Sequence, residues 1–422
     1  MSLFPVGHAS DPNWRSAVEQ VVQQLRGQLL RLSPQQKQQP YRLGLAYVSQ
    51  KLAPHAQQLL ALLARELPQV TDWAGGSGHA VLAMEHEYNE DSSLAVMLLD
   101  VPAAHYRVYS GVAPLAMLGA EAGFEAHSAL VHSSIDQTDL AELLLELSER
   151  TTSGNLFGAL GAEDGVQFAC RAEDLPRLRA EAAAGVFHAG FSGVAFDSDV
   201  GCFSRIAQGC APLGAGIEIT EARGPMLLEL EGEPALPRLL QLLDVEARSS
   251  AGGGWQAALS ELRKTLAAIA PLGRGLERGA LTDEAQVLHI VGLDPVRQGV
   301  ALSASIEPDN TVIFCQRQRH AARHELMQMG AALKDALQPD FADAGPESVN
   351  EQQAPLHIRG AIYMSSKGRG SELFGSDDAE LKLLRHALGP VPLIGLVTEA
   401  QLMDARVHQL AGVLTVFTGK QL

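Results

Sequence analysis

The stretch RLGLAYVS, residues 42–49, decides the fold, because a stretch of the same character, IRGAIYMS, returns at residues 358–365. Each is a short apolar run that includes aromatic or β-branched residues, which is typical of a buried strand. An overlay of the two stretches pairs Gly44 with Gly360, Tyr47 with Tyr363 and Ser49 with Ser365. A repeat of this kind predicts an internal duplication.

The segments that follow the two stretches predict the same order of elements. The first stretch is followed by a helix, a glycine-rich turn and two strands, at Pro54–Leu67, Ala74–Gly78, Ala80–Glu85 and Leu94–Asp100. The second is followed by a helix at Asp377–Leu388 and by strands up to Val413–Phe417, and a weaker third copy runs from Ala129 to Phe196. We therefore expect an α+β protein of repeated β-α-β-β modules, with mostly antiparallel sheets flanked by helices.

Composition narrows the class of protein and its partners. A chain of 422 residues predicts two or three domains, and 46% hydrophobic with 19% charged residues is typical of a globular protein. The formal net charge of -17 repels phosphate backbones and anionic lipid headgroups. We expect neither nucleic acid nor a membrane as a partner.

The cellular compartment is predicted from the absence of a signal peptide, a membrane-spanning segment and paired cysteines in this sequence. The first residues, Met1 to Trp14, show no basic segment followed by an apolar one, and no run of about 18 apolar residues occurs. The four cysteines form no CxxC pair, which argues against a disulfide framework and against a zinc finger. A cytoplasmic protein with reduced thiols is the expectation.

Four stretches of the chain together resemble one family. They are Gly44 to Gly78, Arg205 to Gly214 (RIAQGCAPLG), Gly224 to Leu243, and Ser365 to Gly375 (SSKGRGSELFG). In order and spacing they resemble the FIST family (F-box and intracellular signal transduction), in its stand-alone bacterial form. The resemblance implies an N-terminal helix and linker at 1–36, a FIST N-terminal domain at 37–232 and a FIST C-terminal domain at 233–422.

The resemblance also implies a function. The family is regarded as an intracellular sensory module that binds small ligands such as amino acids, and some bacterial members are haem-binding nitric oxide sensors. This chain departs from the family pattern at two places. It has Ser365-Ser366 where serine-cysteine is usual, and Ala400-Gln401 where glycine-glutamate is usual. A thiol or a carboxylate at those places therefore has no support in this sequence.

The motif around Arg369 is the first candidate ligand site. Arg369 follows a strand and lies between Gly368 and Gly370, next to Ser366 in the same segment. Its guanidinium is predicted to project into a cleft, while the glycines expose backbone N–H groups that suit a carboxylate or a phosphate. The alternative is a flexible surface loop in which glycine only permits the turn.

The second candidate is the segment from Gln208 to Gly214, with two glycines and a proline. It predicts a rigid, irregular strand end that presents Arg205, Gln208 and Cys210 to a ligand. The alternative is a strand edge with a buried thiol. Glu399 completes the set, since Ser366 and Glu399 are the pair of groups that an uncharacterised hydrolase or transferase on this fold would need.

Three histidines and one cysteine are candidate ligands of haem or of a metal. His188, among small residues, and Cys210 are the candidate axial ligands of a haem, and a packed core side chain is the alternative for each. His320 and His324 lie four residues apart on a predicted helix, but neighbouring arginines disfavour a cation there. No metal site is expected, and no cofactor unless it is haem.

The sequence therefore predicts a binding protein rather than an enzyme. No GxxxxGK[ST], GxSxG or HExxH motif occurs. The expected ligand is an amino acid or a similar small carboxylate. The signal is expected to pass to a separate signalling protein, and exposed sheet edges favour a homodimer.

Overall fold

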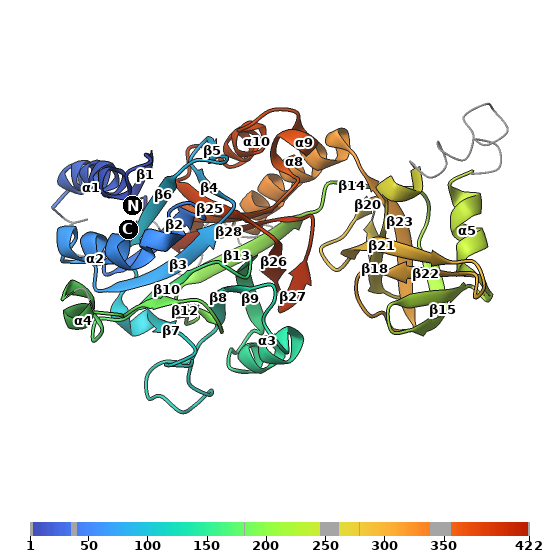
Figure 1. Ribbon diagram of the computed structural model, residues 1–422, viewed down its shortest axis with the longest axis horizontal. Helices are drawn as coiled ribbons and strands as arrows, with labels where there is room; N and C mark the ends of the chain where they lie inside the picture. The colour runs from blue at the N-terminus through green and yellow to red at the C-terminus, as the bar shows by residue number, and fades with distance from the viewer. Residues whose placement is uncertain are drawn as a thin grey trace, which may run out of the picture. The chain divides into compact units, whose positions relative to one another are not determined.

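The computed structural model describes residues 3–34, 40–180, 182–244, 261–277, 279–337 and 356–420 (Figure 1). The chain forms two compact units. Unit 1 consists of Met1–Ile206, Leu326–Val407 and Ala411–Leu422, and unit 2 of Ala207–Glu325 with His408–Leu410. None of the helices in the described ranges is both long enough and apolar enough to cross a membrane.

Unit 1 contains three copies of one module, as the repeat predicted. The first copy runs β2 (Leu43–Ser49), α2 (Ala56–Glu66), β3 (Asp72–Gly78), β4 (Ala80–Ala83), β5 (His86–Tyr88) and β6 (Ser93–Leu99). The second runs β8 (Ser128–Ser134), α3 (Leu140–Glu149), β9 (Asn155–Gly161), β10 (Gln167–Cys170), α4 (Leu175–Arg179), β11 (Val186–Phe187) and β12 (Ser192–Phe196). The third runs β24 (Leu356–Ser366), α9 (Gly370–Phe374), α10 (Ala379–Leu388), β25 (Leu393–Thr398), β26 (Ala400–Met403), β27 (Arg406–His408) and β28 (Gly412–Lys420).

Each module lends its short hairpin to the sheet of another module. The strand β4 of the first pairs with β25 of the third, β10 of the second with β3 of the first, and β26 of the third with β9 of the second. An edge strand completes each sheet: β1 (Val6–Ser10), β7 (Tyr106–Tyr109) or β13 (Gly201–Ala207). The three sheets consequently have one order: β1-β6-β2-β3-β10-β11, β7-β12-β8-β9-β26-β27 and β13-β28-β24-β25-β4-β5.

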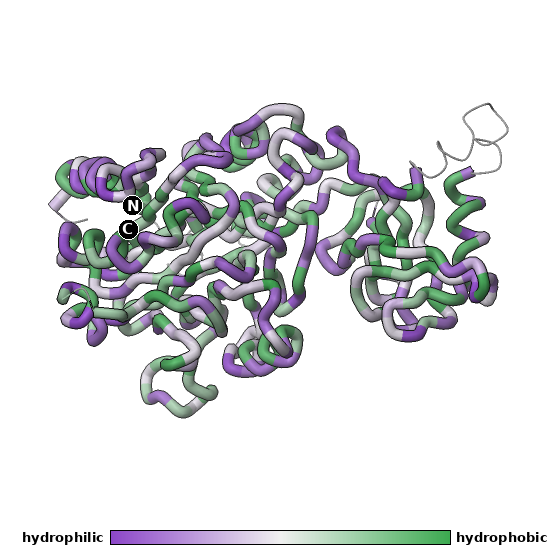
Figure 2. The backbone as a smooth tube through the Cα atoms, in the orientation of Figure 1, coloured by the Kyte–Doolittle hydropathy of each residue, from purple (hydrophilic) through white to green (hydrophobic). Residues whose placement is uncertain are grey.

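The modules share a central core and keep separate outer cores. Leu45, Leu130 and Ile362, one from each module, meet in the central core. Helices cover the other faces, and α1 (Trp14–Leu30) buries Val18, Val21 and Leu25 against the first sheet. Figure 2 shows both hydrophilic and hydrophobic residues along α1, as expected of a helix with one face on a core. Residues 35 and 36, the end of the predicted N-terminal helix and linker, lie outside the described residues.

The glycine-rich segment Ala74–Gly78 is strand, and its prediction as a turn was wrong. These residues belong to β3, which pairs parallel with β2. Gly75 has φ +141°, and a Cβ there would lie 1.9 Å from the carbonyl oxygen of Ala46. Gly75 therefore allows the two strand backbones to approach closely. This requirement explains why a glycine-rich sequence, which is typical of a turn, occurs inside a strand.

The overlay of Tyr47 on Tyr363 was wrong by one residue. Tyr47 faces the central core together with Met364, whereas the Tyr363 hydroxyl donates a hydrogen bond to Glu380 on α10, on the helix-covered face. Side chains alternate along a strand, so a shift of one residue exchanges the two faces. Glycines set the true register: Gly75, Gly158 and Gly395 each press against the partner strand, at Ala46, Val131 and Tyr363.

Unit 2 is a closed sheet inserted in the chain between β13 and β24. Its order is β14 (Cys210–Pro212), β23 (Asn310–Arg317), β15 (Ile217–Arg223), β16 (Met226–Leu230), β22 (Gly299–Leu302), β21 (Gln286–Asp294) and β18 (Thr265–Pro271), and β18 pairs again with β23. The helix α5 (Ala235–Leu242) packs Leu236 and Leu239 on its core. The division between the units falls within α8 (Arg319–Ala336).

Candidate functional site

A small polar pocket lies in unit 1 where several strands end. We call it the strand-end pocket, and its lining residues are Gly76, Ser77, His132, Ser133, Ser134, Ala159, Gly161, Ala162, Gly165, Val166, Gln167, His188, Leu396 and Thr398. They come from all three modules, at or near the carboxyl ends of β3, β8, β9 and β25. The cavity measures about 10 Å³, which is the room that one water molecule needs.

His132 places an uncharged hydrogen-bond donor at this pocket. Its side chain is 3% exposed, and burial lowers its pKa to about 3, so the ring is neutral at physiological pH. Nε2 lies 3.2 Å from the hydroxyl of Tyr47, whose pKa is raised by burial. Because a buried hydroxyl that donates to nothing is costly, we assign the phenol as donor and Nε2 as acceptor. The proton then resides on Nδ1, a buried atom that has no partner in the structure.

Gln167 places an acceptor at the same pocket. Its Nε2 donates to the carbonyl oxygen of Gly190 at 3.1 Å, which fixes the orientation of the amide. Its Oε1 is buried and has no partner in the structure. Gly76 also lines the pocket, and a Cβ there would lie 3.0 Å from the carbonyl oxygen of Val166 and 3.8 Å from Cδ2 of His132. Two residues that line the pocket thus each carry a buried polar atom without a partner among the described residues, a donor on His132 and an acceptor on Gln167.

Two ionisable residues follow the strands that end at the pocket. His79 comes directly after β3 and Glu399 directly after β25, and His79 Nε2 lies 2.7 Å from Glu399 Oε1. Their side chains are 25% and 35% exposed. Glu399, a residue singled out from the sequence, therefore stands beside this pocket, but its partner is His79 and not Ser366.

Ser366 reaches the pocket through a chain of hydrogen bonds. Its hydroxyl donates to Gln401 Oε1 at 2.5 Å, and Gln401 Nε2 donates to Oγ1 of Thr398 at 3.2 Å. Thr398 lines the pocket. Ser366 and Gln401 are also the two positions where the chain departs from the family pattern, so the two departures are in contact with each other.

Arg369 does not project into a cleft, and that prediction was wrong. Its side chain is 1% exposed, and its Nη2 lies 2.7 Å from Oε1 of Glu380. The same carboxylate accepts hydrogen bonds from Tyr363 at 2.6 Å and from Ser365 at 3.0 Å. A buried guanidinium requires a carboxylate partner, and the protein itself supplies one. Gly368 and Gly370 have φ +83° and +26° and form the turn into the short helix α9.

A titratable carboxyl faces Gly370 from β5. A Cβ on Gly370 would lie 2.8 Å from Oε1 of Glu87. Burial, followed by the charges of Glu380, Asp377 and Asp378, raises the pKa of Glu87 to about 7. The folded protein therefore holds this proton more tightly than the unfolded chain does.

We expect Glu87→Gln to flatten the dependence of stability on pH. Protonation of Glu87 stabilises the fold fully below pH 4.5, and this contribution is lost as pH rises through about 7. Above pH 7 the variant should exceed the parent by about 2 to 3 kcal/mol, since one pKa unit corresponds to about 1.4 kcal/mol and solvent screens part of the charge. Urea unfolding of both proteins at pH 5 and pH 8 measures this, and an equal difference at both values would contradict it.

The segment from Gln208 to Cys210 binds a carboxylate, but one from the protein itself. The backbone N–H groups of Gln208, Gly209 and Cys210 donate to Glu325 at 2.7, 2.7 and 3.3 Å. The Gln208 side chain donates to the carbonyl oxygen of Ala285. The predicted irregular strand end is present, and its nest of amides is filled by Glu325. Arg205 lies on β13 in unit 1, where its Nη1 donates to the carbonyl oxygen of Ser204 at 2.8 Å.

The residues proposed for haem do not fit a haem. His188 is exposed and stands at the strand-end pocket among serines, glycines and alanines, where the cavity holds only about 10 Å³. Cys210 is 2% exposed and packs with Cys315 and Ala268 in unit 2. An axial haem ligand needs a broad apolar slot beside it, and the described surroundings of these two residues offer none.

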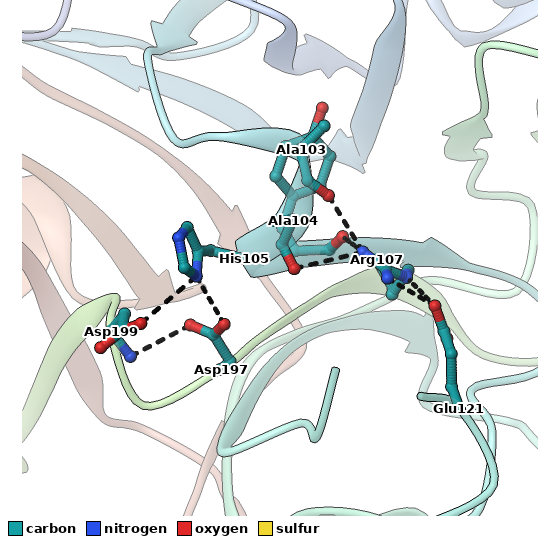
Figure 3. Close-up of polar contacts among 8 residues, drawn as sticks. Ala103, Ala104, His105, Arg107, Glu121, Asp197 and Asp199 are labelled. Carbon is teal, nitrogen blue, oxygen red and sulfur yellow. Dashed lines mark hydrogen bonds and ion pairs between the residues drawn. The ribbon is translucent and has the colours of Figure 1, made fainter. Parts of the chain in front are cut away.

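One group of three metal-ligating side chains occurs among the described residues, and it was missed from the sequence. His105 Nδ1 lies 2.7 Å from Asp197 and 3.5 Å from Asp199 (Figure 3). Asp197 directly follows β12, as Asp100 directly follows β6, and Asp100 is paired with Arg359. Because a side chain of the protein itself, His105 or Arg359, contacts the carboxylate at each of the two equivalent places, we interpret the group as structural. His320 and His324 are exposed, with ring centroids 6.4 Å apart.

His132 and Gln167 are the residues that sequence reasoning missed. Both lie within the weaker third copy of the repeat, Ala129 to Phe196, so the apolar pattern of that segment concealed them. One signal was available: a histidine and a glutamine at the end of otherwise apolar strands are costly to bury without a purpose.

Comparison with known proteins identifies the family. The model of the FIST N domain matches residues 42–233 and that of the FIST C domain residues 235–403. An uncharacterised protein of Mycobacterium tuberculosis is 25% identical over 214 residues, which are 49% of this chain and 47% of the relative. One of Mycobacterium bovis is 26% identical over 211 residues, 47% of this chain and 44% of the relative.

The chain spans about half the length of the curated relatives it matches. The boundary between the two matched domains, at residues 233–235, falls inside unit 2 and not between the units. FIST domains are sensory domains of signal transduction. Because the two domain models together match most of its residues, the chain belongs to the FIST family.

Proposed function

We propose that the protein senses an amino acid or a similar small carboxylate, and that this ligand binds in the strand-end pocket. One observation carries the proposal. Within the described part of the chain the Nδ1 of His132 and the Oε1 of Gln167 are buried without partners, and both residues line the same cavity. Native proteins rarely leave buried polar atoms unpaired, so such atoms call for a ligand or a water molecule.

The chemistry of the pocket supports an amino acid. The carboxylate of the ligand accepts from the Nδ1–H of His132, and the ammonium group donates to Oε1 of Gln167. Both protein groups are neutral, and the ionisable side chains of His79 and Glu399 are part-exposed beside the pocket, where a charged ligand would meet them. The small cavity means that binding must widen it, and a sensory protein needs such a coupling between occupancy and conformation.

The remaining parts of the proposal concern the cell. We infer that the protein acts in the cytoplasm and passes its signal to a separate signalling protein. The net charge of -17 supports this choice over nucleic acid or an anionic membrane as the partner.

Thermal-shift measurements against single amino acids and small carboxylates test the proposal. A ligand at 100 times its Kd adds about 2.7 kcal/mol to stability. Gln167→Met should abolish the response by removing the acceptor, and Gly76→Ala should weaken it, because the added methyl group crowds the cavity wall at Val166 and His132. Gln20→Met, on the exposed face of α1, is the matched control and should respond like the parent. A response that survives both pocket variants would place the ligand elsewhere, and no response at all would overturn the proposal.

A further inference from the structure

The segment of residues 186–190, which we call the strap, lies at the strand-end pocket and is fastened at one end. The carbonyl oxygen of Gly190 accepts hydrogen bonds from Ser133 Oγ at 3.0 Å and from Gln167 Nε2 at 3.1 Å. The N–H of Gly190 donates to Oε1 of Gln137 at 2.9 Å. Three hydrogen bonds therefore converge on one residue, and two of them come from side chains that line the pocket.

The rest of the strap is a short edge strand followed by two exposed residues. Its strand β11 forms two residue pairs with β10 at the edge of a sheet, Gln167 with Phe187 and Phe168 with Val186. His188 and Ala189 are exposed. Val186 and Phe187 pack against hydrophobic cores, so the exposed end of the strap, where His188 lines the pocket, is the part of the wall that moves at the lowest cost.

A carboxylate in the pocket competes for the donors that fasten the strap. The cavity of about 10 Å³ holds a water molecule but no amino acid, so an entering ligand must displace a protein group. The hydroxyl of Ser133 and the Nε2 of Gln167 both point at Gly190, and a charged carboxylate is a stronger acceptor than a backbone carbonyl. Together with Nδ1–H of His132, these groups give a carboxylate three neutral donors.

We propose that ligand binding releases Gly190 from Ser133 and Gln167, and that the freed strap is the conformational output of the sensor. This inference rests on the proposed function, because it requires a carboxylate ligand in the strand-end pocket. It adds the regulation of that site: the closed strap and the ligand exclude each other.

Gln137→Ala tests the competition without changing the pocket. Gln137 holds the N–H of Gly190 and does not line the cavity. Loss of this bond weakens the closed state, so the variant should bind the ligand more tightly, by about 2- to 10-fold, as one net hydrogen bond allows. A merely structural glutamine would leave the affinity unchanged or reduce it. Ser33→Ala replaces an exposed serine outside the pocket and the strap. It is the control for the effects of preparing a variant and should bind the ligand like the parent.

Hydrogen exchange of the full chain completes the test. The probes are the twenty amino acids, each at about 10 mM or its solubility limit, a concentration that saturates even a ligand with a Kd of about 1 mM. Faster exchange of residues 186–192 with a probe that also shifts the melting temperature supports the inference, as does tighter binding by Gln137→Ala. A thermal shift with unchanged or slower exchange there overturns the strap and leaves the sensory site standing. No thermal shift with any probe overturns both.

Discussion

Replacing Glu380 with alanine is expected to destabilise unit 1 by about 3 to 5 kcal/mol, the usual cost of stranding a buried charge. Glu380 is 3% exposed and balances the guanidinium of Arg369, which is 1% exposed. The substitution also leaves the hydroxyls of Tyr363 and Ser365 without their acceptor. Chemical denaturation of the full chain, followed by a probe in unit 1, measures the loss.

Two further variants separate the buried charge from general damage. Arg385→Ala removes the surface ion pair between Arg385 and Glu85, whose side chains are 43% and 36% exposed. This substitution should lower the free energy of unfolding by less than about 1 kcal/mol. The double variant of Arg369→Ala with Glu380→Ala should be less destabilised than the sum of its parts, because it strands no charge. Additive losses would show that the two residues do not act as a pair.

The second large effect is expected at the glycines that press strand against strand. Gly158→Ala should cost more than about 3 kcal/mol, because its φ of +150° is accessible almost only to glycine. Its added Cβ would also lie 2.0 Å from the carbonyl oxygen of Val131, so β8 and β9 would have to separate. Soluble yield and the denaturation midpoint report the loss.

Gly111→Ala is the matched control for this substitution. No heavy atom lies within 4 Å of its added Cβ, and its φ is outside the left-handed region. A change within about 0.5 kcal/mol is expected there. If Gly158→Ala proved equally mild, the close approach of β8 and β9 would not exist in the folded protein.

The module order was predictable from the sequence because apolar runs and helical segments are local features. The exchange of hairpins was not predictable, because the apolar pattern of β4 indicates that the strand is buried but does not indicate which strand is its neighbour. The register failed for a related reason. Matching Tyr47 with Tyr363 follows residue identity, whereas the structure matches Gly75, Gly158 and Gly395, whose common feature is the absence of a side chain.

The sequence predicted residues near the candidate site but not the residues that line it with unpaired polar atoms. Ser366 and Glu399 are near the pocket, but Arg369 is not a free cation, because glycines on either side of an arginine are equally typical of a turn that folds it inward. Gln208, Gly209 and Cys210 form the anion-binding nest that their sequence suggests, and Glu325, more than a hundred residues away, occupies it. Partners so distant in the chain leave no local signal.

The exchange of hairpins also sets the order in which the protein can be completed. During synthesis β4, at Ala80–Ala83, emerges more than three hundred residues before its partner β25, at Leu393–Thr398. Contacts so distant in sequence form slowly, and an unpaired strand edge invites association with other chains in the meantime. A nascent chain of this protein therefore needs protection of its first module until β25 has emerged, and truncations that remove β25 should be recovered as aggregates.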